Sequence, residues 1–102
     1  MKVSHYLDIE PKENVAGAAI REVITAADGA PNFAMRVIEV KAGASTPYHN
    51  HPWEHEVFVL TGEGTVKGEQ EETQIKQGSI VFIPPDEPHN FVNTGSEPLC
   101  FI

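Results

Sequence analysis

The chain has 102 residues, 40% of them hydrophobic and 22% charged, which is typical of a single soluble globular domain. With 7 basic and 15 acidic residues the net charge is −8, which argues against nucleic acid or an anionic membrane surface as a partner. No apolar run approaches the roughly 20 residues needed to cross a bilayer. The first residues contain no signal-peptide stretch, and a single cysteine excludes an internal disulfide, so we expect a cytoplasmic protein.

Short apolar runs rich in Val, Ile and Phe follow one another along the chain. They cover residues 18–26, 32–40, 56–60, 79–83, 89–93 and 99–102. Gly, Pro, Asn and Asp separate them, and no segment of useful length has a capped helical period. This pattern predicts an all-β sandwich or barrel. We expect one domain over residues 1–102, with residues 1–14 as an N-terminal arm.

The expected strand at 32–41 is apolar on both faces. Phe33, Met35 and Val37 alternate on one face, while Ile38 and Val40 share the other with Arg36. A strand of this kind is usually covered on both sides. A barrel of 102 residues has little to cover an outer face except a second copy of itself, so we expect a homodimer.

Three of the five histidines lie within the segment HNHPWEH, residues 49–55. A helix would align His51 with His55, but Pro52 and the β-type flanks argue against one. On a strand, His49 and His51 point to the same face about 6.6 Å apart, whereas His55 would lie about 13 Å from His51 without a turn. Pro-Trp-Glu is the candidate turn that would bring His55 back to the other two.

A fourth histidine ligand is expected from another strand. His89 is the best candidate, because it follows the turn PPDEP and opens the run NFVN. His5 lies in an unpatterned segment and is interpreted as a surface residue. The alternative is a solvent-exposed histidine tract, which does not explain the whole constellation.

At this point the sequence resembles the cupin superfamily. The first cupin motif runs Gly, five residues, His-x-His, three or four residues, Glu, six residues, Gly, and residues 43–62 read GASTPYHNHPWEHEVFVLTG. The metal-binding Glu is replaced by His55. Glu56 is a rival, since a four-residue gap is also permitted, but the spacing to Gly62 favours His55. Strand alternation then points Glu56 away from the metal.

The second cupin motif runs Gly, five residues, Pro-x-Gly, two residues, His, three residues, Asn. Residues 78–93 read GSIVFIPPDEPHNFVN, which supplies Pro84, His89 and Asn93 in register. Asp86 stands where the motif has Gly. Asp tolerates left-handed backbone better than most residues, so the turn is expected to survive.

The resemblance implies a double-stranded β-helix, a conical barrel of six to eight strands with a metal in one mouth. It implies the ligands His49, His51, His55 and His89, as in small single-domain bacterial cupins that are often dimeric and associated with manganese. The cofactor is therefore expected to be a divalent transition metal. The resemblance favours manganese or iron, while an all-imidazole site also suits zinc, nickel or copper.

Four neutral imidazoles leave the ion its full charge, which favours anionic or oxygen-chelating substrates. Two open positions of an octahedral ion would suit an oxygenase or dioxygenase that acts on a small organic molecule. A non-catalytic sugar or metabolite binding module is the alternative, and a sugar-acid isomerase or lyase is the third reading. Whether Arg36, Trp53 and Cys100 line the pocket or serve packing alone stays open.

Overall fold

The computed structural model describes all residues, 1–102, as nine strands in two antiparallel sheets. The six-stranded sheet has the order β1 (Glu13–Val15), β2 (Ala18–Ile24), β3 (Met35–Val40), β9 (Leu99–Phe101), β4 (His55–Thr61), β7 (Ile80–Ile83). The three-stranded sheet has the order β6 (Glu72–Lys76), β5 (Glu63–Lys67), β8 (Asn90–Val92). The structure has no α-helix, and it contains no helix that is long and apolar enough to span a membrane. The all-β prediction is confirmed.

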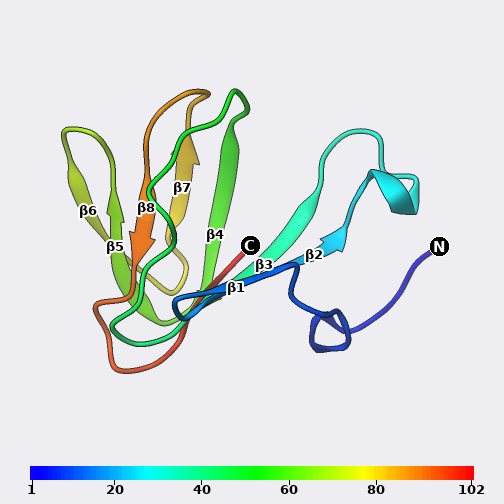
Figure 1. Ribbon diagram of the computed structural model, residues 1–102, viewed down its shortest axis with the longest axis horizontal. Coiled ribbons are helices and arrows are strands. Elements are labelled where there is room, and N and C mark those ends of the chain that lie inside the picture. The colour runs from blue at the N-terminus through cyan, green and yellow to red at the C-terminus, as the bar shows by residue number, and fades with distance from the viewer.

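The two sheets enclose one hydrophobic core. Its centre is fully buried and comes from three strands that lie side by side: Val40, Val59, Leu99 and Phe101. Figure 1 shows β4 to β8 gathered around this core as a body, while the hairpin of β2 and β3 reaches outward from it as a wing. Burial of apolar side chains between the sheets is the main stabilising contribution.

Each of the six apolar runs coincides with much of one strand, namely β2, β3, β4, β7, β8 and β9. The strand expected at 32–41 spans Met35–Val40, so Phe33 precedes it and is 70% exposed. The strands β1, β5 and β6 were not predicted. Their burial pattern is mostly exposed or intermediate, so they carry little of the apolar alternation that reveals a strand.

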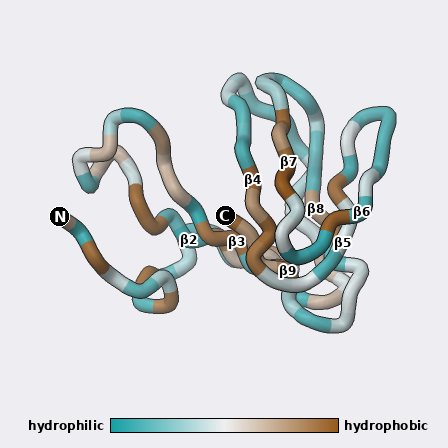
Figure 2. Tube along the Cα trace, turned by 180° about the vertical axis from the view of Figure 1, so that it is seen from behind, coloured by the Kyte–Doolittle hydropathy of each residue, from teal (hydrophilic) through white to brown (hydrophobic).

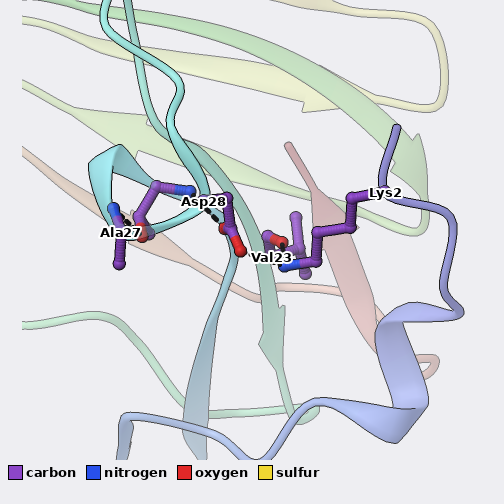
Figure 3. Close-up of polar contacts among 5 residues, drawn as sticks. Lys2, Val23, Ala27 and Asp28 are labelled. Carbon is purple, nitrogen blue, oxygen red and sulfur yellow. Dashed lines mark hydrogen bonds and ion pairs between the residues drawn. The ribbon is translucent and has the colours of Figure 1, made fainter.

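The N-terminal residues fold back along the wing. They include a 3-10 turn at Tyr6–Asp8, and a second such turn at Ala26–Asp28 follows β2. Lys2 Nζ donates to the carbonyl of Val23 at 3.0 Å and to Asp28 Oδ1 at 2.9 Å (Figure 3). These contacts fasten the start of the chain to the far end of β2.

The N-terminal segment lies over part of the outer face of β3, the face for which a second copy of the chain was expected as the cover. Val37, on the outer face of β3, is already buried in the single chain. Arg21 pairs with Val37 across the strands, donates to the carbonyl of Ile9 at 3.0 Å, and lies 5.8 Å from the ring centroid of Tyr6. The chain's own first residues therefore help to cover this face, and the homodimer stays a prediction.

A different apolar surface is left open on the outer side of β4 and β7. Phe58 and Leu60 are 46% and 37% exposed, and Ile80 and Phe82 are 79% and 59% exposed. Phe58 pairs directly with Ile80, so these side chains adjoin one another. Figure 2 shows hydrophobic colouring along β4 and β7. We call these four residues the β4–β7 patch.

Candidate metal centre

The two sequence motifs meet through backbone pairing at one end of the barrel. His49 and His89 form an isolated antiparallel bridge, with His49 N–H donating to His89 O at 3.2 Å and His89 N–H donating to His49 O at 2.9 Å. Asp86 N–H donates to His51 O at 2.7 Å. This second contact requires the left-handed turn at Asp86, whose φ is 67°. The prediction that Asp86 preserves the turn is confirmed.

The chain bends after His51 and returns as a strand that begins at His55. The bend covers Pro52 and Trp53, as the ligand-spacing argument predicted. Because of it, the His51 and His55 rings lie 4.4 Å apart between centroids instead of about 13 Å along an extended strand. The predicted turn and the return strand are confirmed, whereas residues 49–51 form only an isolated bridge at His49 instead of the predicted first strand.

The histidine rings gather around one point. Ring centroids are 5.2 Å apart for His49 and His51, 5.1 Å for His49 and His89, 5.3 Å for His51 and His89, and 5.5 Å for His55 and His89. One nitrogen from each of His49, His51 and His89 falls within 4.8 Å of the others. This is a three-histidine cluster of the kind that holds a metal ion.

The prediction of four converging ligands is therefore met by three. His55 stands beside the cluster rather than within it, with its Nε2 2.7 Å from His51 Nε2 and its Nδ1 3.4 Å from Arg36 Nη2. These two contacts form a consistent chain: the arginine donates to Nδ1, and Nε2–H donates to His51. His55 is held by hydrogen bonds instead of sharing the meeting point of the other three.

Backbone carbonyls orient two of the clustered rings. His51 Nδ1 lies 3.0 Å from Trp53 O, and His89 Nδ1 lies 2.8 Å from Glu87 O. An Nδ1–H that donates to a carbonyl leaves the lone pair on Nε2, the usual arrangement around a bound metal; in His51 this lone pair accepts from His55 in the metal-free site. Sequence reasoning missed these two carbonyls, because a backbone acceptor carries no residue-type signal.

Partial desolvation favours the neutral form of two of the rings. Desolvation, followed by the positive charge of Arg36, lowers the pKa of His55 to about 4. Desolvation and the neighbouring His89 lower the pKa of His49. Neutral imidazole is the form that binds metal, so the site is prepared for a cation near neutral pH.

The other candidate residues divide between the site and the rest of the molecule. Arg36 lies against His55, and Trp53 stacks on His51 with ring centroids 4.5 Å apart and planes 7° apart. Cys100 lies between the core residues Leu99 and Phe101 and faces the opposite side of the sheet, where it pairs with Glu39. That face is away from the histidines.

Glu56, the rival ligand, points outward. It pairs with Phe82 of the exposed β4–β7 patch, while its neighbours His55 and Val57 face inward. The alternation argument against Glu56 is confirmed. No carboxylate belongs to the histidine cluster.

The donor set fits a divalent transition metal and fits calcium or magnesium poorly. Imidazole suits zinc, copper, iron and nickel, whereas the hard cations take oxygen ligands. Two nitrogens bound at right angles to one ion lie about 3.0 Å apart for a bond of about 2.1 Å. The 2.7 Å between His51 and His55 is close to that value, so a small shift would admit His55 as a fourth ligand.

The fold and the site define a class of protein: a small two-sheet β-barrel with a histidine cluster at one end. A cupin domain model matches residues 36–102, and the chain belongs to the cupin family. An uncharacterized protein of Methanocaldococcus jannaschii is 30% identical over 94% of this chain and 78% of its own length.

Two relatives with described activities are similar in sequence or structure. The polyketide cyclase RemF from Streptomyces resistomycificus is 34% identical, with a TM-score of 0.86 over 99% of this chain and 75% of that one. A glucose-6-phosphate isomerase of Pyrococcus abyssi is 38% identical over 61 residues, which cover 54% of this chain and 32% of the isomerase. A predicted oxalate decarboxylase from Thermotoga maritima, 24% identical with a TM-score of 0.83 over 98% of this chain and 94% of that one, shares the fold.

Proposed function

We propose that this cupin is a metal-dependent enzyme that chelates and polarises a small carbonyl compound at a four-histidine centre. The observation that carries the proposal is the convergence of imidazole side chains without any carboxylate. Three of them already share a meeting point, and His55 lies within one nitrogen–nitrogen contact of His51. A divalent ion held there would act as a Lewis acid that polarises a carbonyl oxygen.

The relatives support carbonyl chemistry. A polyketide cyclase and a glucose-6-phosphate isomerase are both named for reactions of carbonyl compounds. A metal that polarises a carbonyl oxygen acidifies the C–H bond next to it, so one kind of centre could serve reactions of this class. The reaction type we infer is enolisation of a small oxygen-chelating ketone or keto acid.

Dioxygenase chemistry is the second candidate. It is favoured by the lack of any carboxylate base in the cluster, because enolisation needs a group that takes up the proton. A third outcome is binding without turnover, as in a metabolite-binding module.

One experiment separates these outcomes. The protein is stripped with a chelator, reloaded separately with Mn²⁺, Fe²⁺ and Zn²⁺, and its metal content is measured. Pyruvate in D₂O is then followed by proton NMR for loss of its methyl signal, while an electrode records dissolved oxygen. Metal-dependent exchange that is lost in His89→Ala supports enolisation, and oxygen uptake supports the dioxygenase. Pyruvate binding with neither signal contradicts both enzyme candidates.

We further propose that the protein forms a homodimer through the β4–β7 patch. Four large apolar side chains that adjoin one another are unusual on a surface that stays in water. Apolar side chains are also exposed next to the wing and in its loop, namely Val15 of β1 at 60% and Phe33, just before β3, at 70%. A two-fold pairing would place the wing of one copy on the body of the other and bury both surfaces. Ile80→Glu is expected to give monomers in sedimentation velocity, and unchanged mass would contradict this surface.

A further inference from the structure

Arg36 is a half-buried cation without an acidic partner. The chain has 15 acidic residues and 7 basic ones, so carboxylates outnumber the cations that could pair with them, and an arginine without one is unexpected. The four ion pairs of the structure involve Lys2, Lys12, Lys67 and Arg21, and none includes Arg36. Its only hydrogen bond is the long contact of 3.4 Å to His55 Nδ1.

The nearest acid on the neighbouring strand is engaged elsewhere. Glu22 stands opposite Arg36 in the register of β2 and β3, yet its carboxylate accepts from Lys12 Nζ at 3.2 Å. Most of the five N–H donors of the Arg36 guanidinium are therefore free. None of these donors is a buried atom without a partner, so they face solvent and are open to a ligand.

The place of Arg36 shows where that partner would lie. The side chain comes from the inward-facing register of β3, which it shares with the core residue Val40, and it reaches the histidine cluster at His55. The opposite case is Arg21, which lies on the outer face and is satisfied by Glu39, by the carbonyl of Ile9 and by the ring of Tyr6. Arg21 is held by several contacts within the protein, whereas Arg36 makes one long hydrogen bond beside the histidine cluster.

We infer that Arg36 is a specificity-determining residue that binds the carboxylate of the substrate, which makes the substrate a small keto or hydroxy acid. The inference rests on the proposed function, because the second point at which the substrate would be held is its chelating oxygen on the metal ion. A planar guanidinium binds a carboxylate through two parallel N–H donors, which fixes the orientation of the acid. A substrate held at both points would present its carbonyl to the cluster in one orientation.

The arginines themselves supply the readout. The chain contains only two, Arg21 and Arg36, so a ¹⁵N-labelled sample gives two side-chain Nε–H signals, assigned by comparison with Arg36→Gln. The Zn²⁺-loaded protein is titrated with pyruvate and, as a neutral counterpart, with pyruvamide. The Arg36 signal is expected to move with pyruvate alone, and the Arg21 signal to stay in place.

Affinities measured in the same titrations give the magnitude. Arg36→Gln is expected to weaken pyruvate binding by about tenfold to a hundredfold, the factor that a hydrogen bond to a charged group represents. Its effect on pyruvamide and on Zn²⁺ content is expected to be under about twofold. Lys41→Gln, which removes an exposed positive charge just after the far end of β3, is the matched control and should leave pyruvate binding unchanged.

The outcomes separate the two proposals. A wild-type protein that takes up no Zn²⁺ contradicts the four-histidine centre. In that case, titration of the metal-free protein with pyruvate still tests carboxylate binding by Arg36, because the Nε–H signal of Arg36 is observed directly. An Arg36 signal that does not respond to pyruvate in either form, or that moves equally with pyruvamide, overturns the carboxylate-binding role. Equal losses of pyruvate affinity in Arg36→Gln and Lys41→Gln would also overturn it.

Discussion

Asn93, the last residue of the second motif, is predicted to be a structural residue of large effect. It is 2% exposed, and its side chain makes three hydrogen bonds. Its Nδ2 donates to the carbonyls of Val40 and Glu97, each at 2.8 Å, and its Oδ1 accepts from Gly95 N–H at 2.9 Å. It therefore ties β3 of the wing to the loop between β8 and β9.

The magnitude follows from these contacts. A hydrogen bond contributes about 1 kcal/mol net, and a buried group left without a partner costs about 1–3 kcal/mol. Val40 is fully buried, so water cannot replace the lost donor at its carbonyl. We expect Asn93→Ala to lower the free energy of unfolding by about 3 kcal/mol, a large share of the roughly 5–15 kcal/mol of a typical domain.

The assay is urea unfolding in the presence of a chelator, so that metal binding does not add to the measured stability. Asn32→Ala is the matched control, because Asn32 is exposed and makes no side-chain hydrogen bond. It should change stability by less than about 0.5 kcal/mol. A loss below about 1 kcal/mol for Asn93→Ala would refute the reasoning and show that the motif requires Asn for another purpose.

Three further predictions concern the metal centre. His89→Ala should greatly reduce metal content after stringent dialysis, whereas Glu56→Gln should leave it nearly unchanged; the reverse result would mean that the first motif uses the glutamate. Because Trp53 is the only tryptophan and stacks on His51, binding of Co²⁺ should quench its fluorescence, and an unchanged spectrum in a metal-loaded sample would contradict ligation by His51. In the metal-free protein, the pKa of His55 near 4 lies below the ordinary 6.5 of an unfolded chain, so the unfolded state takes up the proton first and stability should fall between pH 6.5 and 4. Allowing for solvent around the ring, His55 should contribute about 1–2 kcal/mol of this loss, and chemical denaturation at each pH should show a smaller loss in His55→Gln, where His49 is the only histidine that still has a lowered pKa.

The sequence predicted the strands that bury apolar side chains on one face. Strands such as β4 and β9 reach the core and show it in their composition. The hairpin of β5 and β6 was missed because only Gly64 and Ile75 in it are buried, so its sequence shows almost no alternation of apolar and polar residues. Gly64 is itself a packing residue, since a Cβ there would collide with the carbonyl of Val92. A glycine chosen for close approach looks the same in sequence as one chosen for a turn.

The approach of His55 to His51 was predictable because distance along a strand is a hard constraint. Two imidazoles 13 Å apart cannot share an ion, so the turn between His51 and His55 followed from the spacing alone. The position of His55 relative to the cluster did not, since it depends on Arg36, which lies 19 residues away in sequence. Contacts of that separation leave no local pattern.

The same contact links the two proposals, because it joins His55 of the proposed metal centre to Arg36. A histidine that ligates a metal through Nε2 carries its proton on Nδ1, and that proton usually faces an acceptor, as His51 and His89 face the carbonyls of Trp53 and Glu87. His55 instead faces a donor. If His55 joins the metal, its Nδ1–H and the arginine can no longer bond directly, and an anionic oxygen placed between them would satisfy both. Metal binding at the cluster and carboxylate binding at Arg36 should therefore favour one another, and Arg36→Gln should reduce the gain in Zn²⁺ affinity that pyruvate confers on the wild-type protein.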